Sequence, residues 1–428
     1  MINKIEIVNL KENVNLHLMK SNKFKTDLIG ISFKRQLREE EATMNTLITR
    51  ILERGCENYP SIKELNNKLA DLYGAILVAD VTKYGEKQVM QFKCQMPNKR
   101  HILDKDIYKQ ALELLNEIIT KPYTEDGLFS KDYFEQEKEN LRDEIASLKN
   151  DKVQYSVERC LEVMCPDEPY KIHQYGSIEM LDKITLESLY DHYITLLKTS
   201  KIDIITNGDI DFDEVKNIIN ETLDFNPDNV LEVAEENVYK DIAEVKIHND
   251  YFKKVKQGKI AMGYRTNVKF SDPLYEASML FSGILGGGGN SKLFMNVREK
   301  ESLCYYIFSR VDKYKGIMLI SAGVEFENFE KVHNLIDENF KAILDGDFTD
   351  SDIKIAKDGV VSSINSISDY PNSFINFYYS QSLSNTKFDL EGLKERIENV
   401  TKEEIIEAGK KIQKDTEYYL YSEEMREA

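Results

Sequence analysis

The sequence predicts an α+β protein of two similar domains, each a mostly antiparallel sheet packed with helices. One order of segments occurs twice along the 428 residues: an extended segment, a helix, a pair of strands, further helices and a closing strand. A polar, acidic stretch containing Asn226-Pro227 separates the two copies. We therefore expect an N-terminal domain over 1–222, a linker over 223–243 and a C-terminal domain over 244–428.

The first helix of the N-terminal copy is expected over 43–54, where Gly55 ends it. One of its faces is an apolar stripe at the spacing of a buried helical face, formed by Met44, Leu47, Ile48, Ile51 and Leu52. The opposite face carries Thr46, Thr49, Arg50 and Glu53. The sequence therefore raises the question of what this second face does if it lines a cavity.

The remaining elements follow from periodicity and turn residues. In the first copy we expect extended segments over 4–19 and 27–37, a helix over 61–75, strands over 76–85 and 87–97, helices near 104–120, 130–150 and 186–197, a strand over 201–208 and a helix over 212–223. In the second copy we expect a strand over 259–266, helices over 272–285 and 291–300, strands over 303–311 and 316–324, long helices from 326, a helix near 401–413 and a strand over 417–422.

Composition argues against several classes of protein. The net charge of -18 argues against a nucleic-acid partner, because phosphate binding needs a basic surface. No segment has the roughly 18 apolar residues of a membrane span, and the start of the sequence lacks the apolar region of a signal peptide, so we expect a cytoplasmic protein. The five cysteines are scattered without a CxxC motif, which is typical of reduced packing residues. No two of the six histidines lie within five residues, so a local His-x-x-x-His zinc site is absent.

The helix near 130–150 carries carboxylates on its apolar side. Its stripe consists of Leu141, Ile145 and Leu148, and Glu137 and Glu144 lie on the same side of the helix. A carboxylate on an apolar stripe is costly unless it has a partner or a metal ion. The alternative is that each carboxylate sits at the edge of the stripe and reaches water or a lysine.

Two other patterns carry weaker signals. The run GILGGGGNSKLF is not a phosphate-binding loop, because no Gly-Lys-Ser/Thr follows it; its glycines are expected to end one helix before the next begins. The stretch DYPNSFINFYYSQ is rich in aromatic residues, which either line a peptide cavity or pack in a core. No GxSxG motif or other nucleophile setting is present.

Three stretches resemble the pitrilysin/insulinase family of zinc metallopeptidases, which includes the mitochondrial processing peptidases. The helix over 43–54 resembles the family's zinc helix and its His-x-x-Glu-His motif. With Gly55 as the anchor, the two histidine positions fall on Thr46 and Arg50, and the catalytic glutamate falls on Thr49. The stretch EKENLRDEIASLKND places the family's distant glutamate ligand on Glu144 and a supporting glutamate on Glu137.

The third stretch, LGGGGNSKLFMNVREKESLCYYIFS, resembles the family's second-domain signature. Its substrate-binding arginine and tyrosine match Arg298 and Tyr305. The resemblance covers nearly the whole chain. It implies a pitrilysin/processing-peptidase-like fold of two homologous domains, with the degenerate zinc motif in the first and the Arg/Tyr motif in the second.

The departure from the motif predicts an inactive bacterial member. Threonine is a poor zinc ligand, an arginine at the metal position repels the ion, and Glu144 cannot hold zinc by itself. We expect Arg50 to pair with Glu144 in place of the metal. The resemblance then implies a non-catalytic subunit without a metal or cofactor, whose partner is an active zinc subunit with His-x-x-Glu-His. This chain would form half of a peptide-binding chamber and contribute Arg298 and Tyr305 to peptide binding.

Two alternatives remain open from the sequence. The chain is an interaction or scaffold protein that keeps the fold without a peptidase role, or it holds an unrecognised metal site made of Glu137, Glu144 and a remote histidine such as His173. A partner gene with His-x-x-Glu-His, or loss of partner activity when Arg298 is changed, distinguishes the accessory subunit from the scaffold. Stoichiometric zinc in the purified protein would support the metal site.

Overall fold

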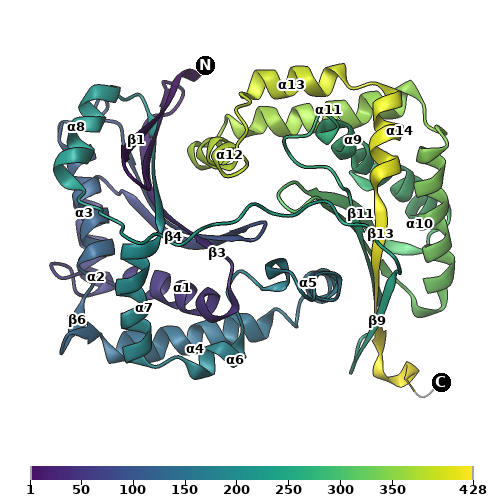
Figure 1. The fold of residues 1–428 in the computed structure, drawn as a ribbon, viewed down its shortest axis with the longest axis horizontal. Coiled ribbons are helices and arrows are strands. Elements are labelled where there is room, and N and C mark those ends of the chain that lie inside the picture. Colours follow the sequence, from purple (N-terminus) through teal and green to yellow (C-terminus); the bar gives the residue numbers. More distant parts are fainter. Residues whose placement is uncertain (1, 427–428) are drawn as a thin grey trace. The chain divides into compact units, whose positions relative to one another are not determined.

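A computed structural model describes residues 2–426 of the chain (Figure 1). These residues divide into two compact units, which we describe separately. Of the described residues, unit 1 comprises 2–146, 172–234 and 368–380, and unit 2 comprises 147–171, 235–367 and 381–426. Each unit is built on one mostly antiparallel sheet with helices, as the sequence predicts.

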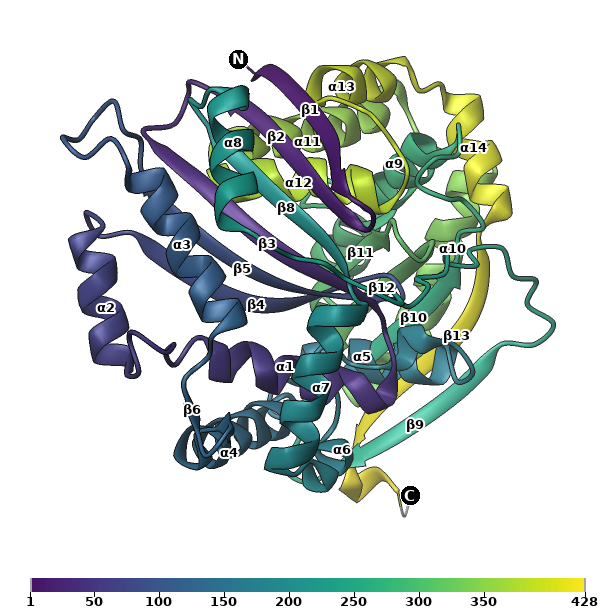
Figure 2. The ribbon, with the colours of Figure 1, turned by 60° about the vertical axis from the view of Figure 1, so that its left-hand side comes forward.

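The sheet of unit 1 has six strands. Their order is visible in Figure 2 and runs β1 (Ile2–Lys11), β2 (Val14–Ser21), β8 (Lys201–Gly208), β3 (Thr26–Gln36), β5 (Lys87–Pro97) and β4 (Ile76–Tyr84). Only the β2–β8 pair is parallel among these strands. The helices of this unit are α1 (Glu39–Leu52), α2 (Ile62–Asp71), α3 (Ile107–Thr120), α4 (Lys131–Ser147), α6 (Ile178–Lys183), α7 (Leu186–Thr199), α8 (Phe212–Thr222) and most of α12 (Pro371–Leu383). A two-stranded ribbon, β6 (Thr124–Glu125) and β7 (Leu128–Phe129), precedes α4.

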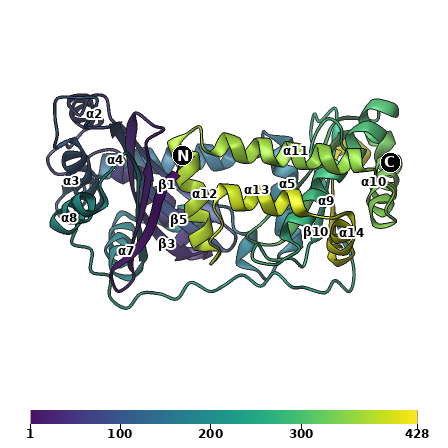
Figure 3. The same ribbon diagram turned by 90° about the horizontal axis from the view of Figure 1, so that it is seen from above.

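The sheet of unit 2 has five strands, in the order β11 (Cys304–Asp312), β12 (Ile317–Val324), β10 (Gly258–Arg265), β13 (Gln413–Ser422) and β9 (Lys246–Phe252). Here the β9–β13 pair is parallel and the others are antiparallel. The helices are α5 (Lys152–Met164), α9 (Tyr275–Gly286), α10 (Phe329–Leu344), α11 (Asp350–Ile367), α13 (Leu390–Asn399) and α14 (Lys402–Lys411). Helices α11 and α13 lie side by side (Figure 3).

The two sheets repeat one topology. Strands β2, β8, β3, β5 and β4 of unit 1 correspond in pairing and direction to β9, β13, β10, β12 and β11 of unit 2, and β1 is added at one edge of the first sheet. The repeat that the sequence predicts is therefore present. Its β9 was not predicted, because the polar sequence KIHNDYF lacks the signature of a strand.

Each sheet carries one helix that comes from the other half of the chain. Helix α5 packs Val157, Cys160 and Met164 against unit 2, in a cluster that includes Ala261 of β10. Gly263 makes this approach possible, because a Cβ there would lie 2.7 Å from the Met164 sulfur.

Helix α12 packs on unit 1, where the Tyr379 hydroxyl donates to Asp203 of β8 at 3.2 Å. The aromatic stretch of the sequence lies in this helix and its start. Four of its rings are buried, and Tyr370 alone among the five is exposed. Core packing, rather than a peptide cavity, therefore accounts for Phe374, Phe377, Tyr378 and Tyr379.

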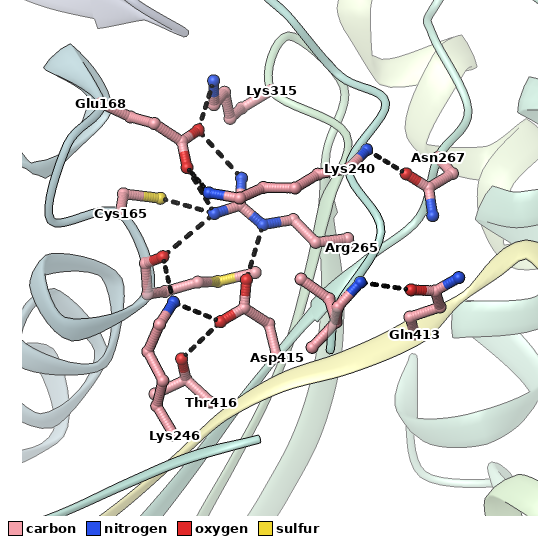
Figure 4. Close-up of polar contacts among 12 residues, drawn as sticks. Cys165, Glu168, Lys240, Lys246, Arg265, Asn267, Lys315, Gln413, Asp415 and Thr416 are labelled. Atoms are coloured by element: carbon pink, nitrogen blue, oxygen red, sulfur yellow. Dashed lines mark hydrogen bonds and ion pairs between the residues drawn. The ribbon is translucent and has the colours of Figure 1, made fainter. Parts of the chain in front are cut away.

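A buried polar cluster fixes the segment after α5 to unit 2 (Figure 4). Arg265 of β10, which is 1% exposed, pairs with Glu168 at 2.7 Å and with Asp415 of β13 at 2.9 Å. Lys240 and Lys315 also pair with Glu168. Burial by itself would raise the pKa of Glu168, but the hydrogen bonds from these three cations lower it to about 2. The cluster therefore ties the chain beside Lys240 to the sheet.

Other sequence predictions can be checked directly. The five cysteines are buried thiols, as expected of packing residues. Residues 223–245 contain no helix or strand. Among the described residues, no helix is long and apolar enough to cross a membrane.

Candidate functional site

The face of α1 that the sequence singles out lines a cavity of about 460 Å³ in unit 1. Helix α1 forms because its apolar stripe is buried in the core of this unit, with Leu47 and Ile48 at most 1% exposed. The cavity is lined by α1 and the residues after it, by α2, by the edge strand β4 and by two further side chains: Thr46, Thr49, Arg50, Glu53, Arg54, Ile62, Leu65, Asn66, Leu69, Leu77, Ala79, Asp80, Val81, Glu137 and Tyr175.

The two threonines of this face are almost fully buried. Thr46 and Thr49 are each 2% exposed. Each hydroxyl donates back to the carbonyl four residues earlier, at 2.9 Å to Ala42 and 2.8 Å to Asn45. Their hydroxyl protons are therefore used within the helix.

Arg50 forms an ion pair with Glu144 of α4, so the predicted pairing is confirmed. The side chains are 24% and 39% exposed. The Arg50 guanidinium also lies 5.8 Å from the centre of the Tyr175 ring, within range of a cation–π interaction. A permanent cation is thus one of the side chains that line the cavity.

A second arginine, which the sequence analysis did not consider, neutralises Glu137. The Arg54 guanidinium donates to Glu137 at 2.9 Å and to Gln136 at 2.6 Å. Glu137 is only 7% exposed. The expected alternative for this carboxylate, water or a lysine, is therefore wrong. The spacing contained the signal, because Arg54 lies one helical turn after Arg50 and Glu137 two turns before Glu144 on α4.

Two further carboxylates of the cavity bind the edge strand. Glu53 accepts from the Ala79 N–H at 3.3 Å, and Asp80 accepts from the Val81 N–H at 2.7 Å. Burial raises the pKa of Glu53, and the nearby Glu137 and Asp80 raise it further. Burial likewise raises the pKa of Tyr175. These contacts occupy two N–H groups of β4 beside the cavity.

The residues of this cavity do not fit a zinc ion. The donor set offers two threonine hydroxyls, a guanidinium, and carboxylates that are each engaged by an arginine or by the backbone. Within residues 2–426 there is no group of three or more His, Cys, Asp or Glu side chains arranged to hold a metal ion. The proposed set of Glu137, Glu144 and His173 is not such a group; the His173 Nδ1 instead accepts from the Tyr175 N–H at 3.2 Å.

Arg298 and Tyr305 both lie in unit 2, in two elements that follow each other along the chain. Arg298 is in a π-helical segment (Phe294–Lys300) that follows α9, and its guanidinium stacks 4.6 Å from the Phe294 ring. Tyr305 lies at the start of β11, where a register shift between Cys304 and Tyr306 marks a bulge, and it is 76% exposed. The structure does not place these two residues relative to the cavity of unit 1.

Arg298 and Tyr305 have few contacts with charged neighbours. Glu301, an acidic residue close to Arg298 in the chain, pairs with Lys331 at 2.7 Å. The Nε atom of Arg298 is 4.0 Å from Glu299, at the limit of an ion pair. The exposure of Tyr305 is incompatible with packing inside a sheet.

The glycine run ends α9 and lines a second cavity of about 360 Å³ in unit 2. Gly288 and Gly289 have open space where a side chain would lie. The Ser291 hydroxyl donates to the Gly288 carbonyl at 2.7 Å and closes the turn. The run therefore has the helix-ending role that the sequence predicts.

Comparisons with known proteins agree with this description. Residues 183–360 match the family model described as "Peptidase M16 inactive domain". The chain is 35% identical over 405 residues to "Probable inactive metalloprotease YmfF" of Bacillus subtilis, which covers 94% of this chain and 95% of that protein.

Solved structures show the same fold over nearly the whole chain. A conserved protein from Enterococcus faecalis is 29% identical, with a TM-score of 0.91, over 98% of this chain and 99% of that one. A structure described as a peptidase M16 inactive domain from Pseudomonas fluorescens is 18% identical, with a TM-score of 0.79, over 98% of each chain. The chain therefore belongs to the peptidase M16 family, as an inactive, non-catalytic homologue of its zinc metallopeptidases.

Proposed function

We propose that this chain is the non-catalytic subunit of a heterodimeric zinc peptidase. In this proposal it forms half of a peptide-binding chamber, and the zinc ion and the His-x-x-Glu-His helix belong to a partner subunit. The degenerate positions Thr46, Thr49, Arg50, Glu137 and Glu144 then have a structural role, because arginine–glutamate pairs stabilise the place where the family binds its metal.

The observation that carries the proposal is the contrast between the two motifs. Arg50 and Arg54 hold the carboxylates of α4 in ion pairs, whereas Tyr305 is exposed and Arg298 reaches Glu299 only at 4.0 Å, the limit of an ion pair. Tyr305 lies at a register shift of β11 and is 76% exposed, which leaves its hydroxyl accessible to a peptide.

Arg298 and Tyr305 would then act on the peptide. The guanidinium and the phenolic hydroxyl both donate hydrogen bonds, and a backbone carbonyl of an extended peptide accepts them. Such contacts orient the peptide for the partner's chemistry without any bond being broken by this chain.

Affinity purification of the chain from its native cells tests the proposal. The expected result is a co-purifying protein with His-x-x-Glu-His at a one-to-one ratio. Recovery of the chain alone, or with proteins that lack this motif, would contradict it and favour the scaffold role. Arg298→Ala and Tyr305→Phe should then weaken peptide binding by the pair, whereas Lys300→Ala, on the same helical segment, serves as the matched control.

A further inference from the structure

A third cavity, of about 190 Å³, lies in unit 1 on the opposite sheet face from the core. Residues such as Phe92 and Cys94 of β5 point into the core, so the alternate positions of this strand point to the other face. That face of β4 and β5, one residue of β3 and the start of α12 line the cavity: Leu28, Ile76, Val78, Asp80, Thr82, Gln91, Lys93, Gln95, Asn372 and Asn376. At this size the cavity suits one small group rather than a whole drug-sized ligand.

Lys93 supplies a directed cation to this cavity. Its ammonium group donates to the side-chain oxygens of Asn372 at 2.9 Å and Asn376 at 3.1 Å. An ammonium group has three N–H donors, so these two bonds leave one for a further acceptor. The two asparagines hold the lysine in place, so less side-chain entropy is lost when a ligand binds to it.

Gln91 supplies a neutral donor. It is 4% exposed, and its Nε2 atom has no hydrogen-bond partner within the described part of the chain. A buried amide without a partner is costly, and such groups call for an explanation. The terminal torsion of glutamine is broad, so this amide can turn toward an oxygen that enters the cavity.

Aliphatic side chains form the open side. Ile76 and Val78 of β4 are 58% and 47% exposed, although both are large apolar residues. In the register of the sheet, Val78 lies opposite Lys93, and Asp80 lies opposite Gln91. The cavity therefore joins two hydrogen-bond donors and the Asp80 carboxylate to an aliphatic wall.

We propose that this cavity binds a carboxylate carried by a short aliphatic group, as found at the C-terminus of a peptide that ends in a residue such as leucine or valine. Lys93 and Gln91 donate to the carboxylate oxygens, and Ile76, Val78 and Leu28 contact the aliphatic part. The identification of the occupant as a peptide rests on the proposed function, whereas the carboxylate site itself does not.

Hydrogen bonding favours this ligand over an amine. The free donors of Lys93 and Gln91 need acceptor atoms, which a carboxylate supplies and an ammonium group lacks. Burial lowers the pKa of Lys93 to about 8, and Asp80 on the neighbouring strand opposes this shift. Asp80 is the charged group that acts on Lys93, and one of its oxygens is already used by the Val81 N–H. The carboxylate of a ligand would stabilise the charged form of Lys93.

The test is an NMR titration of the full chain with two matched probes, N-acetyl-leucine and N-acetyl-leucinamide. It measures the affinity of the chain for each probe. The acid should bind about tenfold or more tightly than the amide, because only the acid forms charge-assisted hydrogen bonds. Its affinity should fall as the pH rises through about 8, where free Lys93 loses its proton. Equal affinities of acid and amide, or no binding of either, would overturn the proposal.

Variants separate this site from a structural role. Lys93→Met and Gln91→Met should both abolish the preference for the acid. Gln91→Met should leave the thermal stability unchanged or raise it, because it removes a buried donor that lacks a partner. Lys25→Met, at an exposed lysine outside the cavity, is the control that should retain binding. Acid selectivity that survives in both variants would also overturn the assignment.

The outcomes also distinguish this site from the accessory-subunit role. If the acid binds but no His-x-x-Glu-His partner co-purifies, the carboxylate site stands and the heterodimer fails. If a partner co-purifies and the acid does not bind, the heterodimer stands and the carboxylate site fails.

Discussion

At the residue scale, Arg50 and Arg54 each take one carboxylate of α4, yet the two pairs differ in burial. Glu144 in the first pair is 39% exposed at its side chain, whereas Glu137 in the second is 9% exposed. A partly exposed pair contributes little because water screens it, and a buried carboxylate that loses its cation is strongly destabilising.

Arg54→Ala should therefore destabilise unit 1 much more than Arg50→Ala. We expect a loss of about 2 kcal/mol or more for Arg54→Ala and of about 0.2–1 kcal/mol for Arg50→Ala. Urea unfolding, followed by a probe placed in unit 1, measures the difference. Equal losses would show that Glu137 does not depend on Arg54.

Histidines at the degenerate positions should restore a metal site. Thr46→His with Arg50→His places two imidazoles one turn apart on the cavity wall and frees Glu144 as a third ligand. Metal analysis should find about one zinc ion per chain in this double variant and none in the natural chain. Adding Glu144→Gln should weaken zinc binding. A double variant without zinc would mean that these residues do not mark the lost metal position.

His192 makes the stability of unit 1 dependent on pH. Its Nε2 atom is 2.8 Å from the Asn45 side-chain oxygen of α1, and burial lowers its pKa from 6.5 to about 4. The unfolded chain therefore binds a proton more readily, so the stabilising contribution of neutral His192 is complete above pH 6.5 and is lost as the pH falls toward 4. Thermal unfolding should show a smaller change over this range in His192→Gln. An unchanged pH profile in that variant would exclude His192 as the cause.

At the element scale, the sequence was sufficient for most helices and strands of both units. Periodicity placed α1, whose apolar residues are buried at regular spacing, and continuous apolar runs placed strands such as β10 and β12, which are buried along their whole length. The ion pair of Arg50 and Glu144 was also predictable, since the family resemblance put both residues at metal-ligand positions. Arg54 was missed because an arginine at the end of a helix is ordinarily solvated.

The exchange of α5 and α12 could not be predicted from the sequence. Their packing depends on which sheet lies beside them, and that information is not contained in the local spacing of apolar residues. The predicted domains, 1–222 and 244–428, follow the order of the chain. They therefore place α5 in the first domain and α12 in the second. The role of Gly263 could not be predicted either, because it depends on the close contact with Met164 of α5.

Gly263→Ala should loosen the contact between α5 and the sheet of unit 2. The added methyl group would lie 2.7 Å from the Met164 sulfur, so the helix or the side chain must move. We expect a loss of about 1–3 kcal/mol, as for other overpacked cores. Met164→Ala in the same chain should restore part of the loss by making room, and a purely additive double variant would contradict this explanation. Thermal unfolding of the two single variants and the double variant measures the effect.

At the scale of the whole molecule, two units of one topology differ at the positions that the family resemblance singles out. Unit 1 has arginine–glutamate pairs there, and unit 2 has an exposed arginine and an exposed tyrosine. In the proposed function, this difference is why the chain carries the second-domain signature without the zinc motif. The central claim is that the retained residues serve a partner's active site.

Peptide hydrolysis by the co-purified one-to-one complex tests this claim most directly. The account predicts that the partner is active only with this chain present, and that Arg298→Ala lowers kcat/KM by about tenfold or more while the complex stays intact. Lys300→Ala should leave the rate unchanged. A partner that cleaves peptides equally well without this chain, or with Arg298→Ala in place, would contradict the account.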